Sequence, residues 1–315
     1  MASTGGALQL GLLLRNGEMS PPDEGRTVGW ADVREMARMA EAVGFDTLWV
    51  ADHFLFRHSP PVMMPEGVTR GVLEAWTLLS ALAAVTSRVT LGPFVACTSF
   101  RNPALLAKMT ETLDEISEGR LLLGLGAGWH EPEYDAFGYP FDHLASRFDE
   151  ALQIIVPLLR EGHVDFAGQY YQARDCELRP RGPRPQGPPV WIGAKGPRML
   201  RLVARYADAY NSVWHADPAP LAEPFANLDA ACREVGRDPT TVVRTSGSFV
   251  TLAEPGDTRE WPAQALTGTP EEVAARLQAF AEVGVRHMAI ILNPWDVPAI
   301  ERFGRVIEAV RRGGS

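Results

Sequence analysis

Eight short strand-like segments alternate with helix-like segments along the chain, and this alternation constrains the fold more than any other feature. The predicted strands cover residues 8–14, 46–53, 88–95, 120–125, 189–193, 208–213, 241–252 and 286–292. Eight strand and helix alternations in 315 residues favour an α/β fold, the (β/α)8 TIM barrel. A doubly wound sheet of two domains is the alternative, but no linker-like change of composition divides the chain. We therefore predict a single barrel domain over residues 1–315.

Capping signals mark the helices between these strands. Asn102 followed by Pro103 is a good helix start, because a capping side chain precedes a proline at the first helical position. Thr269 and Glu272 have the spacing of a capping box, and Gly44 fits a left-handed cap at the end of the first helix.

Two helices carry more specific expectations. Pro157 is expected to kink or shorten the helix that begins near Leu144. The helix after Pro103 is predicted to bury Leu105, Leu106, Met109, Leu113 and Ile116.

The residues beyond a minimal barrel are predicted to form insertions after strands two, four and seven and a hairpin before strand five. The insertion at residues 54–71 carries three prolines, which oppose regular strand pairing, so we expect a lid or pocket wall that includes Met63 and Met64. The hairpin is expected within residues 163–186, where VDFAGQYYQA precedes a proline-rich run.

Composition limits the class of protein. A hydrophobic content of 46% and a charged content of 22% are typical of a soluble globular chain. No segment has the length of a membrane helix or the pattern of a signal peptide, so a cytoplasmic location is expected. The net charge of −9 without a basic run favours a small-molecule partner over nucleic acid or a membrane. The three isolated cysteines predict neither a metal site nor a disulfide framework.

The stretch DTLWVADH places Asp52 and His53 where a buried strand leaves the core. Active sites of TIM barrels gather at the C-terminal ends of the strands, so this pair is a candidate catalytic site. Histidine exchanges a proton near neutral pH, and the adjacent acid could orient it or hold a neighbouring loop. The alternative is that Asp52 caps a turn and His53 packs beneath the lid.

Two glycine-rich segments follow other strands. Gly124, Gly126 and Gly128 leave one side of the backbone bare, which suits either a flat ring or close strand packing. The segment Gly193, Ala194, Lys195 and Gly196 opens a helix, which is typical of a phosphate site, although a plain left-handed turn also explains its glycines.

Taken together, these segments resemble the bacterial luciferase-like monooxygenase superfamily, in particular its branch of oxidoreductases that use coenzyme F420, a deazaflavin. The matching stretches are GFDTLWVADH, SRVTLGPFVACTSFRNPALLAKMTETLDEISEGRLLLGLGAGWHEPEY, PVWIGAKGPRMLRLVARYADAY and GTPEEVAARLQAFAEVGVRHMAI. The resemblance is nearly full length, and its central block is highly specific.

The resemblance implies a role for each matching residue. His53 corresponds to the active-site histidine, with Asp52 beside it as support. Phe94 and Val95 would form the strand-three bulge, often a non-proline cis peptide, that backs the cofactor ring. The remaining cofactor contacts would come from Thr98, Ala127, Gly128, Trp129, Gly193, Ala194, Lys195 and Gly196.

The expected activity is hydride transfer between the deazaflavin and a small, rather apolar carbonyl, alcohol, imine or activated alkene. Trp129 with Met63 and Met64 would cover the ring and line the substrate pocket. Trp129 also replaces the glutamate that follows the glycine motif in the sugar-phosphate dehydrogenases of this branch, so that activity is not carried over.

Three alternatives remain for the function. Reduced FMN in the same pocket would support monooxygenation. A metal-dependent hydrolase using Asp52 and His53, or a non-catalytic deazaflavin carrier, would share the barrel. The family commonly forms homodimers, so a homodimer is expected.

Overall fold

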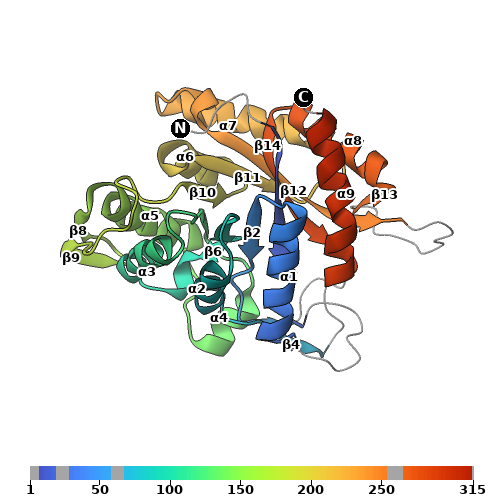
Figure 1. The fold of residues 1–315 in the computed structure, drawn as a ribbon. Helices are drawn as coiled ribbons and strands as arrows, with labels where there is room; N and C mark the ends of the chain where they lie inside the picture. Colours follow the sequence, from blue (N-terminus) through green and yellow to red (C-terminus); the bar gives the residue numbers. More distant parts are fainter. Residues whose placement is uncertain (1–6, 19–27, 58–66, 254–264, 314–315) are drawn as a thin grey trace.

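A barrel of parallel strands surrounded by helices forms the centre of the molecule in a computed structural model (Figure 1). The structure describes residues 7–18, 28–57, 67–253 and 265–313. Its main strands are β1 (Gln9–Leu14), β2 (Thr47–Val50), β5 (Thr90–Pro93), β6 (Ala96–Cys97), β7 (Leu123–Gly126), β10 (Val190–Gly193), β11 (Ala209–Val213), β12 (Val243–Leu252) and β14 (Val285–Leu292).

The sheet closes almost completely on itself. Its strand order is β5-β2-β1-β14-β12-β11-β10-β7-β6, and all these neighbours are parallel. β5 and β6 are consecutive pieces of one strand, interrupted at Phe94 and Val95, so both ends of the order belong to the third barrel strand. A parallel bridge between Leu91 and Leu121 joins β5 to the segment before β7. The predicted TIM barrel is confirmed.

A helix follows each of the eight barrel strands. These helices are α1 (Trp30–Val43), α2 (Ala75–Val85), α3 (Pro103–Ile116), α5 (Leu144–Glu161), α6 (Pro197–Tyr206), α7 (Ala222–Glu234), α8 (Pro270–Glu282) and α9 (Val297–Gly313). The predicted caps are confirmed: Asn102 Oδ1 accepts from the backbone N–H groups of Ala104 and Leu105, and Thr269 forms a capping box with Glu272. None of the described helices is both long and apolar enough to cross a membrane.

One expectation about helices is wrong, and one is wrong in part. Leu105 and Ile116 of α3 are exposed, whereas the polar residues Glu111 and Asp114 are buried. These carboxylates face the segment before strand five, where Arg184 Nε donates to Asp114 Oδ2 at 2.9 Å. Helix α5 also continues past Pro157 to Glu161, so the proline does not shorten it.

The insertions lie where they are predicted, with one correction. Residues 54–71 include an antiparallel pair, β3 (Leu55–Arg57) and β4 (Thr69–Gly71), so their ends do pair despite the prolines. The prolines, Met63 and Met64 lie outside the described residues. The insertion after strand four contains α4 (Glu131–Phe137), and the predicted hairpin is β8 (His163–Ala167) with β9 (Gln172–Glu177).

After strand seven, β13 (Ala265–Gly268) pairs with β12. Short 3-10 helices occur at Thr98–Phe100, Ala219–Leu221 and Pro239–Thr241.

The interior of the barrel is filled by large rings packed against glycines. A Cβ at Gly11 would lie 2.4 Å from Trp49 Nε1, and one at Gly92 would lie 2.5 Å from the same ring, so both positions require glycine. Trp49 Nε1 donates to His287 Nε2 at 3.0 Å. Complete burial lowers the pKa of His287 to about 3, so this imidazole is neutral at physiological pH. These rings close the barrel below the ends of its strands.

Candidate active site at the mouth of the barrel

The C-terminal ends of the strands open at one end of the barrel, which we call the mouth. Helix α4 and the β3–β4 hairpin follow strands four and two respectively, and they lie together at the lower edge of the view in Figure 1. The mouth therefore brings together Asp52, His53, the strand-three bulge and the glycine-rich end of strand four.

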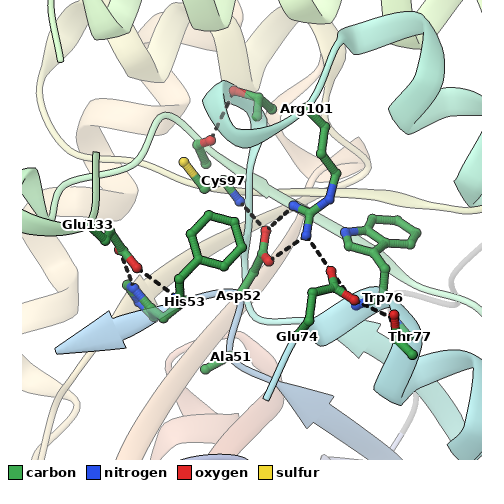
Figure 2. Close-up of polar contacts among 12 residues, drawn as sticks. Ala51, Asp52, His53, Glu74, Trp76, Thr77, Cys97, Arg101 and Glu133 are labelled. Carbon is green, nitrogen blue, oxygen red and sulfur yellow. Dashed lines mark hydrogen bonds and ion pairs between the residues drawn. The ribbon is translucent and has the colours of Figure 1, made fainter. Parts of the chain in front are cut away.

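His53 is held by a carboxylate that is remote in sequence. Its Nδ1 lies 2.7 Å from Glu133 Oε1, and Glu133 Oε2 accepts from the backbone N–H of Phe54 at 2.8 Å (Figure 2). The exposed fraction of the side chain is 18% for His53 and 1% for Glu133. The histidine thus keeps access to the mouth while its partner is buried.

Asp52 has different partners from those expected. Its Oδ2 accepts from the backbone N–H of Cys97 at 2.9 Å and from Arg101 Nη1 at 2.7 Å, while Oδ1 accepts from Arg101 Nη2 at 3.0 Å (Figure 2). The idea that Asp52 supports the His53 ring directly is therefore wrong, because its carboxylate is committed to Arg101 and to strand three. It holds a neighbouring loop, which was the other role considered for it.

Arg101 extends this ion pair to a second helix. Its Nη2 also donates to Glu74 Oε1 at 2.6 Å, and Glu74 accepts from the backbone N–H groups of Trp76 and Thr77 at the start of α2 (Figure 2). Burial is the largest single influence on the pKa of Arg101 and lowers it, but the charges and hydrogen bonds of Asp52 and Glu74 together outweigh burial, and the net pKa is raised. The network joins the ends of strands two and three to α2.

Aromatic rings surround His53. The ring of Phe56 lies 4.5 Å away between centroids, that of Trp129 lies 5.5 Å away, and that of His130 lies 6.4 Å away. Burial lowers the pKa of His130, whose Nε2 accepts from the backbone N–H of Arg57. Trp129 is 52% exposed, which leaves a large apolar surface beside His53.

The predicted bulge in strand three is present. The peptide bond between Phe94 and Val95 is cis, and both side chains are partly exposed between buried neighbours. Cβ atoms at Gly124 and Gly126 would approach the Val95 side chain to 3.0 and 2.7 Å. A Cβ at Gly124 would also lie 2.2 Å from Pro93 O, so close packing against Pro93 and Val95 of strand three explains these two glycines, and the bare surface expected for a flat ring is covered by the valine.

The end of strand four is anchored to α4. Tyr134 Oη donates to Ala127 O at 3.1 Å and lies 3.0 Å from Cys97 Sγ. Gly128 has a φ of 87°, and a Cβ there would lie 1.8 Å from Tyr134 Oη, so no other residue fits. Ala127 and Gly128 are partly exposed at the mouth, as a cofactor contact requires.

Thr98 does not fit its predicted contact as well. Its side chain is buried, with 1% exposed, and its hydroxyl donates to Gly126 O at 3.2 Å. Thr98 therefore has almost no exposed surface that a cofactor ring could contact. Its side chain instead links the ends of strands three and four.

The segment between strand five and α6 has the predicted form. Gly193 and Ala194 are partly exposed, Lys195 and Gly196 are exposed, and Gly196 has a φ of 81° directly before α6. Tyr210 Oη donates to Ala194 O at 3.3 Å. Free backbone N–H groups at the start of α6 and the Lys195 cation suit an anion.

The residues at the mouth fit the predicted cofactor. Six of the residues predicted to contact the cofactor are partly exposed there: Phe94, Val95, Ala127, Gly128, Gly193 and Ala194. They offer an apolar surface for a ring next to a cationic helix start for a phosphate. Fold and site together define a TIM barrel with an apolar mouth and a histidine at its rim.

Comparisons with known proteins identify the family. The family model for luciferase-like monooxygenases matches residues 9–260, so the chain belongs to this family of oxidoreductases and monooxygenases. A phthiodiolone/phenolphthiodiolone dimycocerosates ketoreductase from Mycobacterium sp. (strain JLS) is 33% identical over 70% of this chain and 60% of its own length. The pyrimidine monooxygenase RutA of Yersinia enterocolitica is 33% identical over 69% of this chain and 62% of its own length. The chain thus spans less than two thirds of these relatives.

Solved structures share the fold. An F420-dependent secondary alcohol dehydrogenase in complex with an F420-acetone adduct superimposes with a TM-score of 0.77 at 22% identity, covering 97% of this chain and 100% of that one. At this identity, the likeness establishes the barrel and not the substrate.

Three residues of the site could not be found by reading the strand ends. Glu133 lies on α4, Glu74 precedes α2, and Arg101 follows strand three. In the structure Glu133 and Tyr134 form the buried face of α4, which the sequence alone does not mark.

Proposed function

We propose that the protein is an oxidoreductase that transfers a hydride between coenzyme F420 and a small, rather apolar organic substrate. The substrate would be a carbonyl or alcohol, an imine or an activated alkene. The observation that carries the proposal is His53, which is held by Glu133 at a mouth whose exposed surface is apolar and aromatic. The F420-dependent alcohol dehydrogenase with the same fold supports the choice of cofactor.

The mouth provides a place for each part of the cofactor. Val95 and Phe94 would back the ring, and Ala127 and Gly128 would lie along its edge. The segment from Gly193 to Gly196 would hold the phosphate at the start of α6. Trp129 would cover the ring and exclude water, which strengthens polar interactions inside the site.

His53 would handle the proton of the reaction. When bound, the deazaflavin supplies two-electron hydride chemistry at C5. For an alcohol substrate, the carbinol hydrogen would leave as hydride to the oxidised cofactor and the hydroxyl proton would pass to His53, so that a carbonyl would form. In the opposite direction His53 returns that proton to the carbonyl oxygen.

A reduced-FMN monooxygenase is the second candidate. It is favoured by the 33% identity to the pyrimidine monooxygenase RutA. The metal-dependent hydrolase is disfavoured by the geometry, because the guanidinium of Arg101 occupies both oxygens of Asp52. No cluster of three or more potential ligands for a metal ion occurs among the described residues.

A fluorescence titration of the purified protein distinguishes the two cofactors. We expect coenzyme F420 to bind at least about tenfold more tightly than FMN, a difference of about 1.4 kcal/mol. Tighter binding of FMN would overturn the deazaflavin assignment. Binding of F420 without turnover of any ketone, alcohol, imine or enone would instead favour a carrier.

A further inference from the structure

We infer that Glu133 is the positioning residue of His53: it fixes the hydrogen of the imidazole on Nδ1 and leaves Nε2 as the atom that exchanges protons. The use of Nε2 in a reaction rests on the proposed function. The tautomer itself follows from the contacts of the protein alone.

The two oxygens of Glu133 each have one donor. Oε2 accepts from the backbone N–H of Phe54 at 2.8 Å, and Oε1 lies 2.7 Å from His53 Nδ1. A carboxylate only accepts hydrogen bonds, so Nδ1 must carry the hydrogen. In the neutral imidazole Nε2 then has the lone pair, and it forms no hydrogen bond within the described ranges of the chain.

Glu133 is itself held firmly. It lies on α4 next to Tyr134, and the exposed fraction of both is at most 1%. The Tyr134 hydroxyl fixes α4 to the end of strand four by donating to Ala127 O. A buried carboxylate on an anchored helix can therefore set the orientation of the imidazole, as outer partners do for other functional histidines.

Among the described residues, no carboxylate other than that of Glu133 contacts the His53 ring. The oxygens of Asp52, the adjacent residue, bind Arg101 and the backbone N–H of Cys97. Phe56 packs on the His53 ring without a polar contact. The carboxylate that reaches the His53 ring thus comes from Glu133 on α4.

The variant Glu133→Gln tests this assignment. A glutamine has one acceptor and one donor group at its end, whereas Phe54 N–H and Nδ1–H are both donors. If the amide oxygen stays on Phe54, the amide NH2 faces Nδ1 and favours the tautomer with the hydrogen on Nε2. Asp135→Asn, an exposed change on the same helix with the same change of charge, is the matched control.

Two readouts on the protein without cofactor or substrate report the tautomer. In ¹⁵N-histidine NMR, with His53 assigned from its loss in His53→Asn, we expect a protonated Nδ1 and a bare Nε2 in the wild type and in Asp135→Asn. Modification of His53 by diethylpyrocarbonate, followed by peptide mass spectrometry, should be at least about fivefold slower in Glu133→Gln, since the reagent needs the Nε2 lone pair. Glu133→Asp should restore part of the rate.

The outcomes separate cleanly. A hydrogen on Nε2 in the wild type, or an unchanged tautomer and modification rate in a folded Glu133→Gln, would overturn the inference. Because neither readout involves a cofactor, failure of the hydride-transfer proposal would leave both results in place. Thermal melts of all variants establish that each is folded.

Discussion

Replacing His53 with alanine is expected to lower kcat by about 10²- to 10⁴-fold, the usual contribution of a positioned acid or base. The imidazole is the partly exposed titratable group held at the mouth by Glu133, and alanine leaves the substrate without a proton partner. The dissociation constant of the deazaflavin should change by no more than about threefold, because the ring would rest on Val95 and the phosphate on α6. Steady-state kinetics with the ketone or alcohol turned over fastest by the wild type measures the effect.

His163→Ala is the matched control for this experiment. His163 lies on the exposed β8–β9 hairpin, where it pairs with Asp175, and the same substitution there removes an imidazole away from the mouth. Its kinetics should match those of the wild type. Near-normal turnover in His53→Ala would show that this histidine is structural.

Replacing Arg101 with methionine is expected to lower the free energy of unfolding by about 3–5 kcal/mol, a large part of the total stability of a typical protein. The side chains of Arg101 and Asp52 are 9% and 0% exposed, so the variant leaves the Asp52 carboxylate buried without its cation. The backbone N–H of Cys97 would be its remaining partner. Urea unfolding followed by circular dichroism measures the loss.

A double variant distinguishes the stability lost with the ion pair from the stability lost with the packing of the Arg101 side chain. In Asp52→Asn/Arg101→Met no buried charge is left unpaired, so part of the lost stability should return. Arg205→Met, an exposed arginine on α6, should change stability by no more than about 0.5 kcal/mol. Equal stabilities of Arg101→Met and Arg205→Met would contradict the role given to the ion pair.

The barrel could be predicted from the sequence because its signals are local. Most of the parallel strands, such as β1, β2 and β14, are largely apolar runs, and caps such as Asn102 and Thr269 act within a single turn. The buried face of α3 could not be predicted in the same way. Asp114 is buried because Arg184, about seventy residues later, supplies a partner, and Glu111 accepts from the backbone N–H of Gly182 in the same segment. No helical periodicity records such contacts.

The residues of the candidate site were likewise predictable from the sequence only in part. His53 and the segment before α6 follow from their positions at strand ends, where the barrel collects them. The Phe94–Val95 bulge was implied by the family resemblance alone. The partner of the His53 ring depends on how α4 folds back over the mouth. The sequence therefore could not show that this partner is Glu133 and not Asp52, the residue next to His53. Thr98 was assigned by the resemblance, but its burial depends on the packing between strands three and four.

A crystal structure of the protein with coenzyme F420 tests the central claim most directly. We expect the ring inside the mouth against Val95, with its hydride-exchanging edge toward His53 Nε2 and its phosphate at the start of α6. A deazaflavin bound elsewhere on the barrel, or one whose reactive edge faces away from His53, would contradict the account.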